Sequence, residues 1–107
     1  MFVTFIESPI FSSYLFDYLT DEEYAALQEH LCEHPDAGDL VRGSGGVRKV
    51  RWGRSGSGKS GGVRICYYVR TQVGQILMLV IYAKSARDSI SGHVLKAIKE
   101  AMEHVDD

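Results

Sequence analysis

The stretch that decides the fold runs from Gly43 to Arg70 and reads GSGGVRKVRWGRSGSGKSGGVRICYYVR. Two runs rich in β-branched and aromatic residues, at 47–52 and 63–69, flank a glycine- and serine-rich segment, which is typical of two strands joined by a loop. The stretch holds eight of the eleven glycines and seven lysines and arginines, but no acidic residue. Alternating cations and aliphatic residues beside a cationic loop favour contact with a negatively charged partner.

The 107 residues are expected to form a single domain, 1–107, because 45% hydrophobic content and only two prolines favour a globular fold. No apolar run reaches the ~18 residues that a membrane span requires, and the first residues do not resemble a secretory signal. We therefore expect a cytoplasmic protein with no membrane partner. Without an export signal, Cys32 and Cys66 are expected to be free thiols.

Charge is strongly segregated along the chain. Residues 1–39 carry nine acids and no lysine or arginine, residues 40–87 carry ten bases and no acid, and residues 88–107 carry five acids and two bases. One interpretation is that acidic helices and a basic sheet neutralise each other in the fold. The other is a basic sheet face that binds a polyanion, and the two interpretations are compatible.

Outside the organising stretch, the N-terminal part predicts one strand and two helices. Residues 2–6 alternate as a first strand. Ser8 followed by Pro9 is a helix start, and Thr20 to Glu23 reads as a capping box that starts a second helix. The second helix is expected to end near Pro35.

The C-terminal part predicts a strand and a helix. Residues 75–83, QILMLVIYA, are apolar on both faces and indicate a central strand. Ser91 is expected to cap a last helix, whose apolar side consists of Leu95, Ile98, Met102 and Val105.

The order β-α-α-β-β-β-α predicts an α+β fold, in which an antiparallel meander sheet has the helices packed on one face. The other face would be open. Alternation along the strands places Val50 and Trp52 on one side and the neighbouring cations on the other. The cations expected to converge on this open basic face are Lys49, Arg51 and Arg64, with Lys84 at its edge.

Residues 53–60, GRSGSGKS, match the P-loop pattern G-x-x-x-x-G-K-S. That motif requires a helix directly after the lysine, because the helix N-terminus holds the phosphates. Here Ser60 is followed by two glycines and a predicted strand. We therefore do not expect nucleotide hydrolysis.

The segments GSGGVRKVRW, GKSGGVRICYY and LVIYAKS follow an acidic helix pair, and in this order they resemble the RelE superfamily of type II toxins, in particular its HigB branch. The resemblance extends over nearly the whole chain. It implies a RelE-like fold and a ribosome-dependent mRNA endoribonuclease, an mRNA interferase that inhibits translation. It also implies a cognate helix-turn-helix antitoxin of the HigA kind, through which operator DNA would be bound.

By motif position, the resemblance implies that the catalytic residues are Lys49, Arg51, Arg64 and Lys84. Ser85 replaces an arginine that the family often has. The last helix lacks the tyrosine that some members use, and Tyr82 is a substitute for it. Contacts to RNA or the ribosome are expected from Arg48, Arg54, Lys59, Tyr68 and Tyr82.

The expected chemistry needs no metal or cofactor, because RNA carries its own nucleophile, the 2′-hydroxyl. The histidines lie outside the basic region, so a lysine crowded by arginines, Lys49, is the expected general base. The alternative functions are a ParE-type gyrase inhibitor and a decayed toxin that binds RNA or antitoxin without cleavage. Arg48 shares a strand face with Val50, so the alternative to an RNA contact is a structural role, in which Arg48 pairs with an acidic residue of the N-terminal helices. Cys66 lies beside the cations but is expected to take no part in the reaction.

Overall fold

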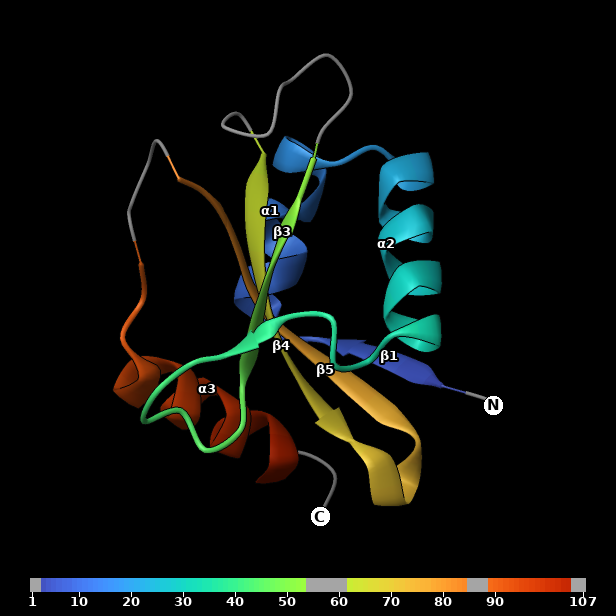
Figure 1. Ribbon diagram of the computed structural model, residues 1–107. Coiled ribbons are helices and arrows are strands. Elements are labelled where there is room, and N and C mark those ends of the chain that lie inside the picture. Colours follow the sequence, from blue (N-terminus) through green and yellow to red (C-terminus); the bar gives the residue numbers. More distant parts are fainter. Residues whose placement is uncertain (1–2, 54–61, 85–88, 105–107) are drawn as a thin grey trace.

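The structure is a computed structural model that describes residues 3–53, 62–84 and 89–104 (Figure 1). Its elements, in chain order, are β1 (Thr4–Glu7), α1 (Pro9–Tyr18), α2 (Asp21–Glu33), β2 (Asp39–Leu40), β3 (Arg48–Trp52), β4 (Val63–Arg70), the 3-10 turn η2 (Thr71–Val73), β5 (Gln75–Ala83) and α3 (Gly92–His104). The part of the chain that the structure describes contains no helix long and apolar enough to cross a membrane.

The helix starts follow the predicted capping residues. The Ser8 side chain accepts a hydrogen bond from the Phe11 amide, and Pro9 occupies the first turn of α1. Thr20 and Glu23 form the reciprocal hydrogen bonds of a capping box at the start of α2. The Ser91 hydroxyl accepts a hydrogen bond from the Val94 amide ahead of α3. These caps use amides that have no partner inside a helix.

The sheet has five strands in the order β1-β5-β4-β3-β2. The α+β class is confirmed, and β3, β4 and β5 form the predicted antiparallel meander. Two other details of the sheet differ from the prediction. β1 pairs with β5 in parallel, because α1 and α2 carry the chain over one face before the remaining strands form. The two-residue strand β2, which was not predicted, pairs with Arg48 and Lys49.

The pairing of β4 with β5 contains a register shift. Cys66 lies opposite Val80 and Tyr67 lies opposite Met78, so Leu79 is an extra residue on β5. Side chains normally alternate between the faces of a strand, and an extra residue interrupts this alternation. Leu79 and Val80 consequently both pack in the same core cluster.

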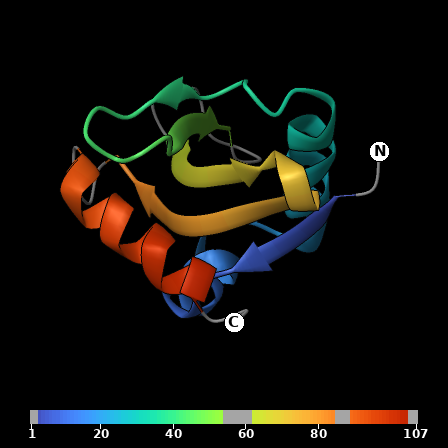
Figure 2. The ribbon, with the colours of Figure 1, turned by 90° about the horizontal axis from the view of Figure 1, so that it is seen from below.

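Two separate cores lie on the two faces of the sheet. We call the face covered by α1 and α2 the hairpin face, and the face covered by α3 the α3 face; Figure 2 shows α2 and α3 on opposite sides of the sheet. The hairpin-face core includes Phe11, Leu27, Ile65, Tyr67 and Met78. Members of the α3-face core are Val47, Cys66, Leu77, Leu79, Val80, Tyr82, Leu95 and Met102.

The prediction that all helices pack on one face is therefore wrong for α3. α1 and α2 already bury the apolar side chains of the hairpin face, so the apolar stripe of α3 is buried against the opposite face. Leu95 and Met102 lie in that stripe, as expected. Val105 lies outside the described residues. The expected open basic face is thus partly covered.

Candidate functional site

A row of three side chains crosses the α3 face near the end of the sheet where β3 ends and β4 begins. We call this end the loop end. Arg51 of β3 lies directly opposite Arg64 of β4, and Arg64 lies directly opposite Tyr82 of β5. Side chains in directly opposite positions have Cβ atoms about 5 Å apart. The structure therefore brings together the two predicted catalytic arginines and Tyr82.

The Leu79 bulge is the reason that Tyr82 joins this row. Below the bulge, Leu77 faces α3 and Met78 faces the hairpin. Strict alternation from Met78 would put Tyr82 on the hairpin face. Because Leu79 is extra, Tyr82 packs on the α3 face instead. The single sequence contains no signal for this shift, since β5 has no alternation of polar and apolar residues after Gln75.

Arg64 is the buried cation of the row, beside Tyr82, which is buried as well. The Arg64 side chain is 8% exposed, and its Nη1 atom has no hydrogen-bond partner among the described residues. Arg51, directly opposite, is exposed. Two cations placed opposite each other destabilise a sheet, and a buried cation is costly unless an anion pairs with it. The pair is therefore suited to binding an anionic group of a ligand.

Lys49 lies on the same face, two residues before Arg51 in β3 and directly opposite Cys66 of β4. Lys49 is half-buried. Burial raises the pKa of the Cys66 thiol to about 12, and the positive charge of Lys49 opposes this rise. Cys66 is thus held as a neutral thiol, in keeping with its expected role as a bystander.

The remaining predicted cations are distributed more widely. Lys84 follows the last residue of β5 and is exposed. Arg48 points to the hairpin face, where its Nη1 atom donates hydrogen bonds to the backbone oxygens of Gly38, at 2.8 Å, and Asp36, at 3.3 Å. Arg48 thereby fastens the segment after α2, and its contact with RNA stays a prediction. Arg54 and Lys59, most of the P-loop-like segment and Ser85 lie outside the described residues.

Tyr68 is also on the α3 face, and it contacts a residue that the sequence reasoning missed. The Lys99 Nζ atom lies 4.6 Å from the centroid of the Tyr68 ring and donates a hydrogen bond of 3.0 Å to the Gly45 carbonyl. Lys99 is 8% exposed. A signal for this was present, because Lys99 lies four residues after Leu95 and therefore falls on the apolar stripe of α3.

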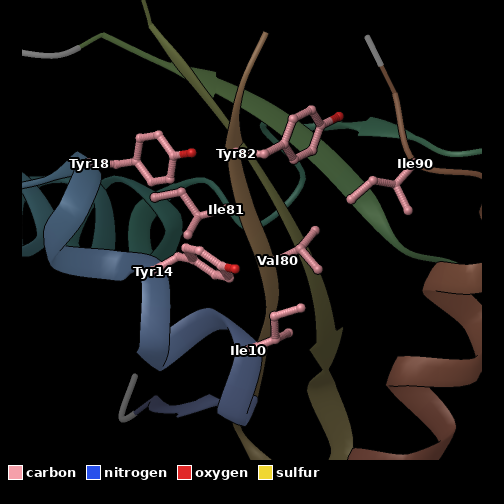
Figure 3. A pocket seen from close by; sticks show the side chains of 7 residues that line it. All are labelled: Ile10, Tyr14, Tyr18, Val80, Ile81, Tyr82 and Ile90. Carbon is pink, nitrogen blue, oxygen red and sulfur yellow. The ribbon is translucent and has the colours of Figure 1, made fainter. Parts of the chain in front are cut away.

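A pocket of about 390 Å³ lies beside the row, at the edge of β5 (Figure 3). In Figure 3, Tyr14 and Tyr18 of α1 lie on one side of β5, and Tyr82 and Ile90 lie on the other. Its lining residues are Ile10, Tyr14, Tyr18, Val80, Ile81, Tyr82 and Ile90. None of them is charged, so the pocket and the cationic row differ in chemistry although they share Tyr82.

Among the described residues, no group of three or more His, Cys, Asp or Glu side chains is placed to hold a metal ion. The chemical groups at the loop end of the α3 face are guanidinium, ammonium and phenol. Guanidinium groups donate paired hydrogen bonds to phosphate oxygens, and lysine ammonium groups supply positive charge or a proton. Electrostatic stabilisation of a phosphate is therefore within reach of this row.

The comparison with solved structures identifies the fold. The chain superimposes on the structure of the Escherichia coli toxin RelE, solved in the free state as a mutant with two arginines replaced by alanine. The TM-score is 0.59, the sequence identity is 17%, and the match covers 94% of this chain and 98% of that chain. This chain has the RelE fold.

No family model matches the sequence. The RelE fold therefore rests on the three-dimensional arrangement, which agrees along nearly the entire length of both chains. It includes the mixed five-stranded sheet and the helices on both of its faces.

Proposed function

We propose that this chain is a ribosome-dependent mRNA endoribonuclease, the toxin of a type II toxin–antitoxin module of the HigB branch. The observation that carries the proposal is the pair formed by Arg51 and the buried Arg64 in a RelE fold. The substrate would be mRNA in the ribosomal A site. Its cleavage would stop translation in the cytoplasm.

The reaction would begin with attack of the 2′-hydroxyl on the adjacent phosphorus. The bond from phosphorus to the 5′-oxygen of the next nucleotide breaks, and a 2′,3′-cyclic phosphate forms. Negative charge increases on the phosphate oxygens during this step. Arg51 and Arg64 would stabilise this charge, since guanidinium groups make strong paired hydrogen bonds to phosphate.

Two protons must move in this step. Lys49, on the same face as the arginine pair, would accept the proton of the 2′-hydroxyl. Lys84, exposed beyond the end of β5, would supply a proton or positive charge to the leaving 5′-oxygen. Tyr82, directly opposite Arg64 on the neighbouring strand, would help to hold the Arg64 side chain in place and would contact RNA beside it.

The further predicted contacts would serve docking. Arg48, Arg54, Lys59 and Tyr68 would contact ribosomal RNA or mRNA, with affinity that falls as salt is raised. The partner in the cell would be a HigA-like helix-turn-helix antitoxin, which would also connect the toxin to operator DNA.

The test compares wild-type protein with Arg64→Ala on mRNA that is free in solution and on mRNA held in programmed ribosomes. We expect the wild type to cleave only on ribosomes and Arg64→Ala to lose about 10²- to 10³-fold in single-turnover rate, because one donor to the transition state is removed. Circular dichroism of the variant checks that it is folded. A 2′-deoxy nucleotide at the cut site should abolish cleavage.

Each other result points to a different function. Absence of cleavage together with blocked DNA supercoiling would favour a gyrase inhibitor of the ParE type. Absence of both activities, with antitoxin or RNA still bound, would favour a decayed toxin. Cleavage of the 2′-deoxy substrate would refute the 2′-hydroxyl mechanism.

A further inference from the structure

Two contacts join α3 to the turn that precedes β3. Figures 1 and 2 both show the chain between β2 and β3 passing beside α3. Lys99 donates its hydrogen bond to the Gly45 carbonyl in this turn. Gly92, at the start of α3, lies so close to the turn that an added Cβ would be 1.9 Å from the Arg42 carbonyl oxygen. The turn and α3 are therefore fitted to each other.

The turn is shaped around Lys99. Gly45 has a φ of +73°, and a Cβ there would lie 2.8 Å from the Lys99 Nζ atom. Gly46 has a φ of +104°, and a Cβ there would lie 3.1 Å from the Tyr68 ring. Residues other than glycine rarely adopt such positive φ values. Two glycines of the GSGG motif thus create the space that the Lys99 ammonium and the Tyr68 ring occupy.

The same turn sets the start of β3. The Ser44 hydroxyl donates to the Val41 carbonyl at 2.6 Å and accepts a hydrogen bond of 3.0 Å from the Val47 amide. The Val41 amide donates to the Val47 carbonyl at 2.8 Å. Val47 is fully buried. Lys49 follows two residues later, so its place on the α3 face depends on how this turn is held.

Burying a lysine is costly, and Lys99 is compensated by one carbonyl and one aromatic ring. Lys96 lies near the same turn, since a Cβ on Gly45 would be 3.7 Å from its Cγ atom, but Lys96 is exposed and carries its charge at no such cost. The position of the Lys99 ammonium between α3 and the turn therefore indicates a function beyond covering apolar surface.

We propose that Lys99 is a positioning residue: by holding the Gly43–Gly46 turn and the Tyr68 ring, it keeps β3 in register with β4, so that Lys49 lies opposite Cys66 and Arg51 lies opposite Arg64. Its role in cleavage rests on the proposed function. Its role in placing the turn does not, and can be measured without any substrate.

The experiment uses three variants of the full chain. Lys99→Met removes the ammonium and keeps an unbranched side chain that is one atom shorter, and Lys99→Arg keeps a cation. Lys96→Met is the matched control, because it removes an exposed ammonium from α3 and retains the Cγ atom near Gly45. Backbone amide hydrogen exchange of Val41 and Val47 is measured by NMR, with the ring proton shifts of Tyr68. Single-turnover cleavage is measured on programmed ribosomes at several ribosome concentrations.

We expect Lys99→Met to exchange the Val41 and Val47 amides about tenfold faster. It should also lose about tenfold to a hundredfold in cleavage rate at saturating ribosomes, because small displacements of catalytic groups are costly. The ribosome concentration for half-maximal rate should stay unchanged. Lys99→Arg should restore most of both properties, since arginine also donates hydrogen bonds and stacks on tyrosine. Lys96→Met should behave as wild type.

Unchanged exchange and ring shifts in Lys99→Met would overturn the proposal. Slower cleavage by Lys99→Met without a change in amide exchange would also overturn it and would indicate that Lys99 contacts the substrate directly. So would faster amide exchange in Lys99→Met if this variant cleaved at the wild-type rate. If the wild type cleaves no RNA, the proposed function fails, while amide exchange still decides whether Lys99 places the turn.

Discussion

The two faces of the sheet are closed in different ways. On the hairpin face, α1 and α2 cover a core made of apolar side chains, and Arg48 is satisfied by backbone carbonyls. On the α3 face, a single helix covers part of the sheet, and Figure 1 shows it away from the loop end, where β3 ends. Arg51, Arg64 and Tyr82 lie there.

The difference teaches how a domain of 107 residues accommodates a site. A small chain buries too little surface to surround a site with additional layers. Here one face supplies stability, and the other combines a smaller core with the pair of Arg51 and Arg64, which has no carboxylate directly opposite it in the described strands. Lys49 differs, because Asp39 of β2 lies directly opposite it. Substitutions at matched positions on the two faces should therefore affect different properties.

The largest effect is expected from a neighbouring pair in β5. Met78 and Leu77 are both buried but point to opposite faces. Met78→Ala should cost about 3–5 kcal/mol of unfolding free energy, because two helices and the sheet hold the cavity open. Leu77→Ala should cost less, about 2–3 kcal/mol, because the single helix α3 can settle into the gap. Urea unfolding measures both, and equal losses would show that the faces are equally rigid.

The next largest effects are expected for the two arginines of β3, one of which should affect cleavage and the other stability. Arg51→Ala should lower single-turnover cleavage about 10²-fold with little change in stability, because Arg51 is exposed on the α3 face. Arg48→Ala should leave the cleavage rate at saturating ribosomes within about threefold, because the contact predicted for Arg48 would serve docking. It should cost about 1–3 kcal/mol of unfolding free energy, because it removes hydrogen bonds from a charged donor to carbonyls. Loss of cleavage in Arg48→Ala, with the fold retained, would mean that the hairpin face also takes part in activity.

The smallest effect concerns the two thiols. Burial raises the pKa of Cys66 from its ordinary value of 9.0 to about 12, whereas Cys32 is half-buried at the surface of α2. At pH 8.5, iodoacetamide should therefore alkylate Cys32 well before Cys66, as mass spectrometry would show. The unfolded thiol loses its proton at lower pH than the folded one, so Cys66 makes the unfolding free energy fall as pH rises from 9.0 towards about 12. Alkylation of Cys66 at the same rate as Cys32 would refute this burial.

Much of the fold could be predicted, because local signals are strong where they occur. The caps at Ser8, Thr20 and Ser91 and the strand at 75–83 are confirmed. The opposite orientation of Lys49 and Val50 on β3 also follows from alternation alone. The fold class then followed from the order of the elements and is confirmed by the RelE match.

What could not be predicted depends on contacts between distant segments. The parallel pairing of β1 with β5 and the side on which α3 packs are decided by which apolar surfaces remain uncovered. The burial of Arg64 is a property of the assembled sheet, and the roles of the four predicted catalytic residues stay predictions. Lys99 was within reach of sequence reasoning, because it lies four residues after Leu95, but no role was predicted for it.

The Leu79 bulge gives β5 two parities. Up to Met78, even-numbered residues face the hairpin, whereas Tyr82, also even-numbered, faces α3. Deletion of Leu79 would remove the bulge and leave the faces of the residues after it unchanged. Strict alternation through all of β5, with Leu79 kept, would instead exchange the two sides of everything that follows, placing Ile81 among the cations and the Tyr82 phenol in the hydrocarbon core. The chain would keep every residue of its site and lose the site, so the spacing between Met78 and Tyr82 carries as much information as the identities of the residues themselves.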